Sequence, residues 1–157
     1  MRLLEFGTVF LLGFFSCVFI LSFNFSTDLE IPFGFGGNSV NAPVNRIVED
    51  DIIIYDDSIV LKVSNATISR YANSGSMKPV LDKGANGIRI VPKSEEDIDV
   101  GDIVTYRFGG RLIVHRVVDK GEDGEGAFFV MKGDNNDFND GKVRFSDIRY
   151  VTIGVLY

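Results

Sequence analysis

The chain has 157 residues, with 16 Lys+Arg against 22 Asp+Glu and a formal net charge of -6 at pH 7. This length fits one ordinary domain. The acidic balance argues against a dedicated nucleic-acid binder, which needs a basic face to displace counterions from phosphates. One cysteine (Cys17) and one histidine (His115) exclude an intramolecular disulfide and any metal site that needs several thiolates or two imidazoles from one chain.

The most apolar segment is residues 6–23, which read FGTVFLLGFFSCVFILSF without a charge. A helix of this length rises roughly 27 Å, close to the hydrocarbon thickness of a bilayer. A cleavable signal peptide and a buried core helix are the alternatives, but no A-x-A-like cleavage site follows the run and few polar residues interrupt it. We therefore expect a single transmembrane anchor over 6–23. Because Arg2 and the terminal amine precede it, residues 1–5 are expected in the cytoplasm and the rest of the chain on the outer side of the cell membrane.

The chain beyond the anchor divides into a linker and a β-rich domain. Residues 24–45 are rich in Gly, Asn, Ser and Pro and are expected to be the linker. Over 46–157 no segment keeps the apolar period of about 3.6 residues that a helix needs, so helix is expected to be scarce. The predicted strands, in chain order, are 51–55, 58–63, 66–71, 86–92, 102–108, 112–118, 127–132 and 150–157.

The connections between these strands predict antiparallel pairing. Asp56-Asp57 and Gly109-Gly110 are turn sequences between adjacent strands, and 119–126 is expected to be a loop. Short antiparallel strands over 46–157 predict a mainly β, compact domain of barrel-like or sandwich type.

The first candidate functional segment is SGSMKP at 74–79. Gly75 permits unusual backbone angles and Pro79 fixes the exit of the turn, so Ser76 is expected to be held in one orientation. A serine placed in this way serves as a nucleophile only if a base removes its proton. An ordinary turn is the alternative interpretation of this segment taken alone.

The second candidate is His115, in the middle of an apolar predicted strand, where alternation places it on the same face as Ile113 and Val117. A core histidine bonded to a backbone carbonyl is the alternative. Histidine is the side chain best suited to move a proton near neutral pH, and only a lysine competes with it here for the role of base.

The third candidate is the polar segment 131–142, which contains the carboxylates Asp134, Asp137 and Asp140. A Ca²⁺ loop is one interpretation, but its spacing matches the known pattern loosely and no bidentate Glu follows at the expected distance. A solvated loop is the second interpretation. In the third, a carboxylate of this loop accepts the second ring N–H of His115 and orients it.

Taken together and in this order, these segments resemble the type I signal peptidases of the archaeal and endoplasmic-reticulum branch. The matching stretches are SGSMKP at 74–79, DVGDIVTY at 99–106, IVHRVV at 113–118 and KGDNN at 132–136. The resemblance runs from about residue 70 to the C-terminus. It implies a membrane-anchored serine endopeptidase of the Ser-His-Asp type with the catalytic domain of that family.

The resemblance also implies roles for five residues. Ser76 is the expected nucleophile, and His115 occupies the general-base position, which is lysine in the bacterial and mitochondrial branch. Asp140 is a better match to the triad acid than Asp134, which is kept as a supporting residue. Ser74 matches the position whose hydroxyl, with the Ser76 backbone N–H, stabilises the oxyanion.

The implied activity is the removal of signal peptides from secreted precursor proteins. The expected partners are these precursors, membrane lipid, and accessory subunits or the translocon, with no cofactor, metal or nucleic acid. An extended substrate is expected to pair with residues 66–71 or 87–91. Two alternatives stay open: an inactive membrane-tethered β domain that binds extended peptides, and a self-cleaving repressor protease with a Ser-Lys dyad, for which Lys78 lies only two residues from Ser76.

Overall fold

The computed structural model describes residues 40–157. The anchor expected at 6–23, the short N-terminus before it and most of the expected linker lie outside the described residues, so these boundaries stay predictions. Among residues 40–157, no helix has the length and apolar character needed to cross a membrane.

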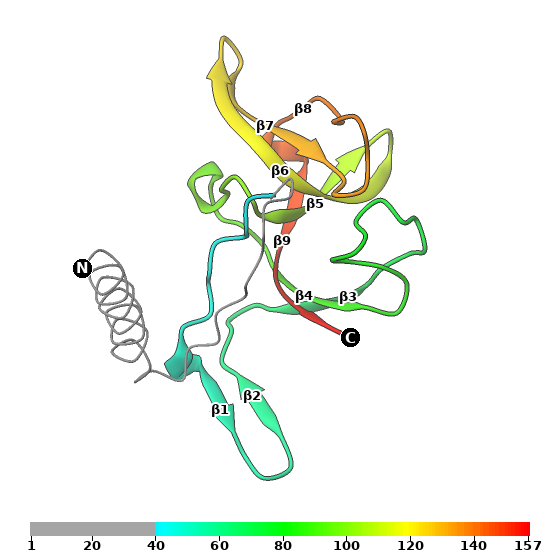
Figure 1. The fold of residues 1–157 in the computed structure, drawn as a ribbon. Helices are drawn as coiled ribbons and strands as arrows, with labels where there is room; N and C mark the ends of the chain where they lie inside the picture. Colours follow the sequence, from blue (N-terminus) through cyan, green and yellow to red (C-terminus); the bar gives the residue numbers. More distant parts are fainter. Residues whose placement is uncertain (1–39) are drawn as a thin grey trace, which may run out of the picture. The chain divides into compact units, whose positions relative to one another are not determined.

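The described chain is mainly β, as the sequence predicts. Seven strands form one antiparallel sheet in the order β3-β4-β9-β5-β6-β7-β8, and β1 and β2 form a separate hairpin (Figure 1). The strands are β1 Ile52–Ile54, β2 Ile59–Leu61, β3 Thr67–Arg70, β4 Asn86–Ile90, β5 Ile103–Phe108, β6 Arg111–Asp123, β7 Gly126–Lys132, β8 Lys142–Val143 and β9 Ile148–Leu156. The helices described are short 3-10 turns, at Glu49–Asp51, Glu95–Asp97 and Phe145–Asp147.

The expected barrel-like closure is not found among the described residues. The sheet ends in β3 on one side and β8 on the other, and these edges do not pair with each other in residues 40–157. Strand β8 has only two residues, Lys142 and Val143, which pair with Val130 and Phe129 of β7. So short a strand offers too few hydrogen bonds to continue the sheet into a closed ring.

The loop expected over 119–126 is also wrong, because β6 continues to Asp123 and β7 begins at Gly126. The two strands stay paired to the end, with Asp123 opposite Gly126. Gly121 supports this ribbon: a Cβ at this position would lie 2.8 Å from the Phe128 ring, so the missing side chain leaves room for the ring. The polar residues that suggested a loop belong to the end of a long hairpin.

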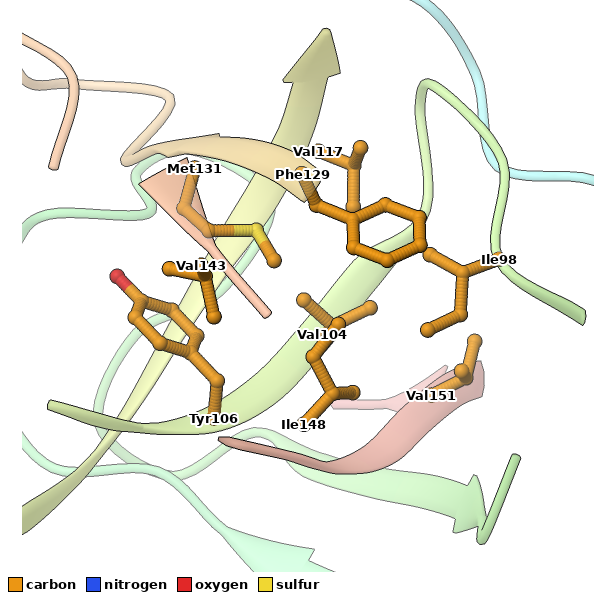
Figure 2. Packing of buried hydrophobic residues seen from close by; sticks show 9 residues of the cluster. All are labelled: Ile98, Val104, Tyr106, Val117, Phe129, Met131, Val143, Ile148 and Val151. Carbon is orange, nitrogen blue, oxygen red and sulfur yellow. The ribbon is translucent and has the colours of Figure 1, made fainter. Parts of the chain in front are cut away.

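Strand alternation gives β5 two buried faces. Val104 and Tyr106 enter the main core, whereas Ile103 enters a smaller cluster with Met77 and Leu81. The buried residues of the main core are Ile98, Val104, Tyr106, Val117, Phe129, Met131, Val143, Ile148 and Val151. Figure 2 shows them together, with the hydroxyl oxygen of Tyr106 directed outward from the cluster. The site described next lies where β5, β6 and the loops after β3 and β7 meet.

Candidate active site

A cavity of about 620 Å³ brings together residues that lie far apart in the sequence. Its lining includes Ser74, Ser76, His115, Met77, Leu81 and Val114. Ser76 and His115 therefore face one cavity, which has an apolar wall beside its polar groups. Convergent polar groups in a partly apolar cavity are the usual form of a small-molecule or peptide site.

The segment that carries Ser76 is held at both ends by its own sequence. Gly75 has φ +73°, a left-handed conformation that favours glycine. Met77 is buried in the smaller core cluster, and its carbonyl accepts the N–H of Leu81 at 2.8 Å. The Ser76 hydroxyl lies 3.1 Å from the Ser74 hydroxyl, and the Ser76 N–H donates to the same Ser74 oxygen at 3.4 Å.

The loop after β7 is bound directly to this serine segment. The Asn135 N–H donates to the Ser76 carbonyl at 2.9 Å, and the Asn135 side-chain amide donates to the Gly75 carbonyl at 3.1 Å. Gly133 makes this close approach possible, because a Cβ at this position would lie 2.6 Å from the Ser76 carbonyl oxygen. The KGDNN stretch therefore helps to fix the position of Ser76.

Asp134 and Arg116 form a buried ion pair. Arg116 donates to both carboxylate oxygens at 2.7 Å, and the two side chains are only 5% and 3% exposed. Arg116 also donates to the carbonyls of Gly101 at 2.7 Å and Asn41 at 3.1 Å. Both oxygens of Asp134 are thus bound to Arg116, and this carboxylate anchors the loop after β7.

Asp140 is the carboxylate that contacts His115. Its Oδ2 accepts a hydrogen bond from His115 Nδ1 and another from the Tyr106 hydroxyl at 2.5 Å. Register explains how Tyr106 and His115 meet: His115 lies opposite Val104 and Tyr106 opposite Ile113, so both side chains leave the same face of the β5–β6 pair.

The protonation of the Tyr106 hydroxyl follows from burial. Burial, followed by the hydrogen bond to Asp140, raises the pKa of Tyr106 above its ordinary value of 10.0. The tyrosine is therefore protonated at neutral pH and donates to the carboxylate. In a neutral imidazole that donates from Nδ1, the lone pair is on Nε2, so the contact of His115 Nδ1 with Asp140 is the arrangement that a general base requires.

Three residues that contact the site were not predicted as site residues from the sequence: Tyr106, Arg116 and Asn135. In the family that the sequence resembles, an Arg commonly follows the triad acid. In this chain Gly141 follows Asp140 and offers no side chain to support the carboxylate. Tyr106 is the donor found at Asp140 instead. Tyr106 ends the matching stretch DVGDIVTY, but its contact with Asp140 depends on the register of β5 against β6.

The Ca²⁺ interpretation of segment 131–142 is not supported. Asp134 is bound to Arg116 and Asp140 to His115 and Tyr106, so two of the three carboxylates are occupied by side chains. Within residues 40–157, no group of His, Cys, Asp and Glu side chains is placed to hold a metal ion.

The chain is similar to curated proteins named signal peptidase complex catalytic subunit SEC11. The relative from Pyricularia oryzae is 36% identical over 80 residues, which is 50% of this chain and 46% of that protein. Over 69 residues, 43% of this chain and 40% of each relative, the identity is 36% for Clavispora lusitaniae and 39% for Metarhizium acridum. The chain therefore matches less than half the length of each of these relatives. No family model and no solved structure matches it. These relatives are named as catalytic subunits of a signal peptidase complex.

Proposed function

We propose that this chain is a membrane-bound serine endopeptidase that removes signal peptides from secreted precursor proteins. The observation that carries the proposal is the placement of Ser76 and His115 on one cavity, with Asp140 bound to His115 Nδ1. The similarity to SEC11 supports the same activity, because those relatives are named as catalytic subunits of a signal peptidase complex.

In the proposed reaction Ser76 Oγ attacks the scissile carbonyl carbon while His115 Nε2 takes the serine proton. Asp140 holds the imidazole in orientation and stabilises its charged form. The tetrahedral intermediate collapses when His115 returns the proton to the leaving amine, and water then hydrolyses the acyl-enzyme with His115 again as base. The oxyanion is assigned to the Ser76 N–H and the Ser74 hydroxyl, which lies 3.1 Å from the nucleophile. Asp134 contributes by anchoring the loop that holds Ser76.

The substrate is proposed to bind as an added strand along β3. Of the two candidate strands, β4 is paired on both sides, with β3 and with β9, whereas β3 is an edge of the sheet formed by residues 40–157. The unpaired side of β3 can bind an extended peptide through main-chain hydrogen bonds. Ser69 and Arg70 of β3 line the same cavity as Ser76, so a peptide on this edge would run toward the nucleophile.

The location and partners are part of the same proposal. The uncharged run at 6–23 would hold the enzyme in the cell membrane by a single pass, with the β domain on the outer side. Accessory subunits are proposed because the relatives are named as subunits of a complex.

The test is cleavage of a secretory precursor by the full-length chain reconstituted in lipid vesicles. Ser76→Ala, His115→Ala and Asp140→Ala are compared with wild type, and Ser58→Ala is the matched serine control because Ser58 lies on the β1–β2 hairpin away from the cavity. We expect the Ser76 and His115 variants to lose roughly 10³-fold or more in rate, as other serine triads do. Unchanged cleavage by Ser76→Ala would refute the proposal. Peptide binding without turnover in wild type would favour the inactive peptide-binding domain.

A further inference from the structure

We propose that Tyr106 is a positioning residue that acts through Asp140: its hydroxyl fixes the carboxylate that orients His115. The link to turnover rests on the proposed function. The geometry and the first measurement below do not depend on it.

Tyr106 can fix Asp140 because the two residues differ in how firmly the fold holds them. Tyr106 is fully buried in the main core on β5, between the paired strands β6 and β9. Asp140 lies in the loop between β7 and β8, and its side chain is 20% exposed. The residues on either side of Asp140 give no support of the same kind, since Asn139 is exposed and Gly141 has no side chain. A group held by the core thus donates to a carboxylate held by a loop.

The hydrogen-bond inventory fixes the direction of each contact. A phenol has one proton to donate, and the 2.5 Å contact shows that Tyr106 donates it to Asp140 Oδ2. The distance of 3.4 Å from the Tyr106 oxygen to His115 Nδ1 leaves Asp140 as the acceptor for the Nδ1 proton. Tyr106 therefore does not compete with Asp140 for His115. It holds the carboxylate where His115 needs it.

Removing the hydroxyl takes away this restraint. The carboxylate is then free to turn toward water for part of the time, since hydration replaces the lost donor. His115 in that state has no acceptor for Nδ1–H, and the proton moves to Nε2 in a larger fraction of molecules. A histidine with its proton on Nε2 cannot accept the proton of Ser76 through that nitrogen.

The first test is the imidazole tautomer in Tyr106→Phe, which keeps the aromatic ring in the core. His115 is the only histidine in the chain, so ¹⁵N labelling of histidine gives one pair of ring-nitrogen signals without assignment. Both proteins are measured at full length in detergent micelles. We expect wild type to show mainly the Nδ1–H tautomer of His115 and Tyr106→Phe to show a clearly larger Nε2–H fraction. Tyr150→Phe is the matched control, since Tyr150 lies on the adjacent strand β9 and its ring stacks with Arg89.

The second test is a double-mutant cycle on precursor cleavage. Tyr106→Phe is expected to lower kcat roughly 5- to 50-fold with KM nearly unchanged, as misplacement of a catalytic group does. In an Asp140→Ala background the same change is expected to have no further effect, because the group through which it acts is gone. A role in packing alone would lower the melting temperature, leave the tautomer unchanged and lower activity equally in both backgrounds, and that result would overturn the proposal.

A third measurement needs no variant of Tyr106. A protected low-field resonance of the Tyr106 hydroxyl proton is expected in wild type and should disappear in Asp140→Ala. Its persistence in that variant contradicts the assigned hydrogen bond. Absence of precursor cleavage by wild type would refute the proposed function, while the tautomer and hydroxyl measurements would still decide the role of Tyr106.

Discussion

Asp134→Asn tests whether the second carboxylate of the polar loop serves the fold or the chemistry. The substitution keeps the shape of the side chain and removes its charge. The Arg116 side chain, which is 3% exposed, then remains buried without a negatively charged partner. Breaking a buried ion pair by removing one partner costs about 3–5 kcal/mol, because the remaining charge is left uncompensated.

The loss of stability in Asp134→Asn is expected near the lower end of that range. Arg116 keeps the Gly101 and Asn41 carbonyls as acceptors, and the new amide oxygen can still accept one of its N–H groups. A loss of about 3 kcal/mol from a domain of this size lowers the melting temperature by roughly 10 °C. Activity should fall as well, because the loop anchored by Asp134 carries Asn135, which binds the Ser76 carbonyl.

The assay is thermal unfolding of the full-length protein, followed by circular dichroism. Asp137→Asn is the matched control, since Asp137 lies in the same loop and is exposed. The double variant Arg116→Met, Asp134→Leu should be more stable than Asp134→Asn, because no unpaired charge stays buried. Equal melting temperatures for Asp134→Asn and Asp137→Asn would refute the reasoning. Asp140→Ala should show the opposite pattern, with lost activity and a smaller change in stability.

Two further predictions concern the ends of the β6–β7–β8 region. Hydrogen bonds from Lys142, the Glu125 N–H and Arg144 hold the pKa of Asp123 below its ordinary value of 3.8, so its stabilising contribution is present above that pH and is lost as the pH falls through the lower folded-state value. Asp123→Asn should therefore lower the melting temperature at pH 7 and lower it by a smaller amount at about pH 2, where the carboxylate of the unfolded chain is already protonated. An equal effect at both pH values would contradict this. Gly133→Ala should displace the serine loop and reduce cleavage, since its Cβ would lie 2.6 Å from the Ser76 carbonyl oxygen, whereas Gly124→Ala has open space and should behave as wild type in cleavage and unfolding assays.

Much of the β domain could be predicted from the sequence, because local patterns decide local structure. The alternation around Asp56-Asp57 gave the β1–β2 hairpin, and the Gly109-Gly110 turn gave the β5–β6 pair. The missed end of β6 has a physical cause, since its last residues are polar and their strand form depends on pairing with β7. The sequence of this segment alone does not show that β7 pairs with it.

The candidate site divides in the same way between sequence and structure. His115 could be selected from its residue type, because it is the only imidazole in the chain, whereas Ser76, one of many serines, depended on its turn sequence and on the resemblance. The choice between Asp134 and Asp140 as partner of His115 depended on tertiary contacts, since both carboxylates lie in one short loop. Asp134 is bound to Arg116 and Asp140 to His115.

The composition set limits: a chain with one histidine has one imidazole to offer, and the acidic balance argues against a dedicated nucleic-acid binder. Those limits follow from residue counts and hold for any fold. The support of Asp140 by Tyr106 depends on which residues of β5 and β6 lie opposite each other, and register is a property of the folded sheet. A shift of one residue would turn Tyr106 to the other face, so only the tertiary structure decided that this hydroxyl meets the His115–Asp140 pair.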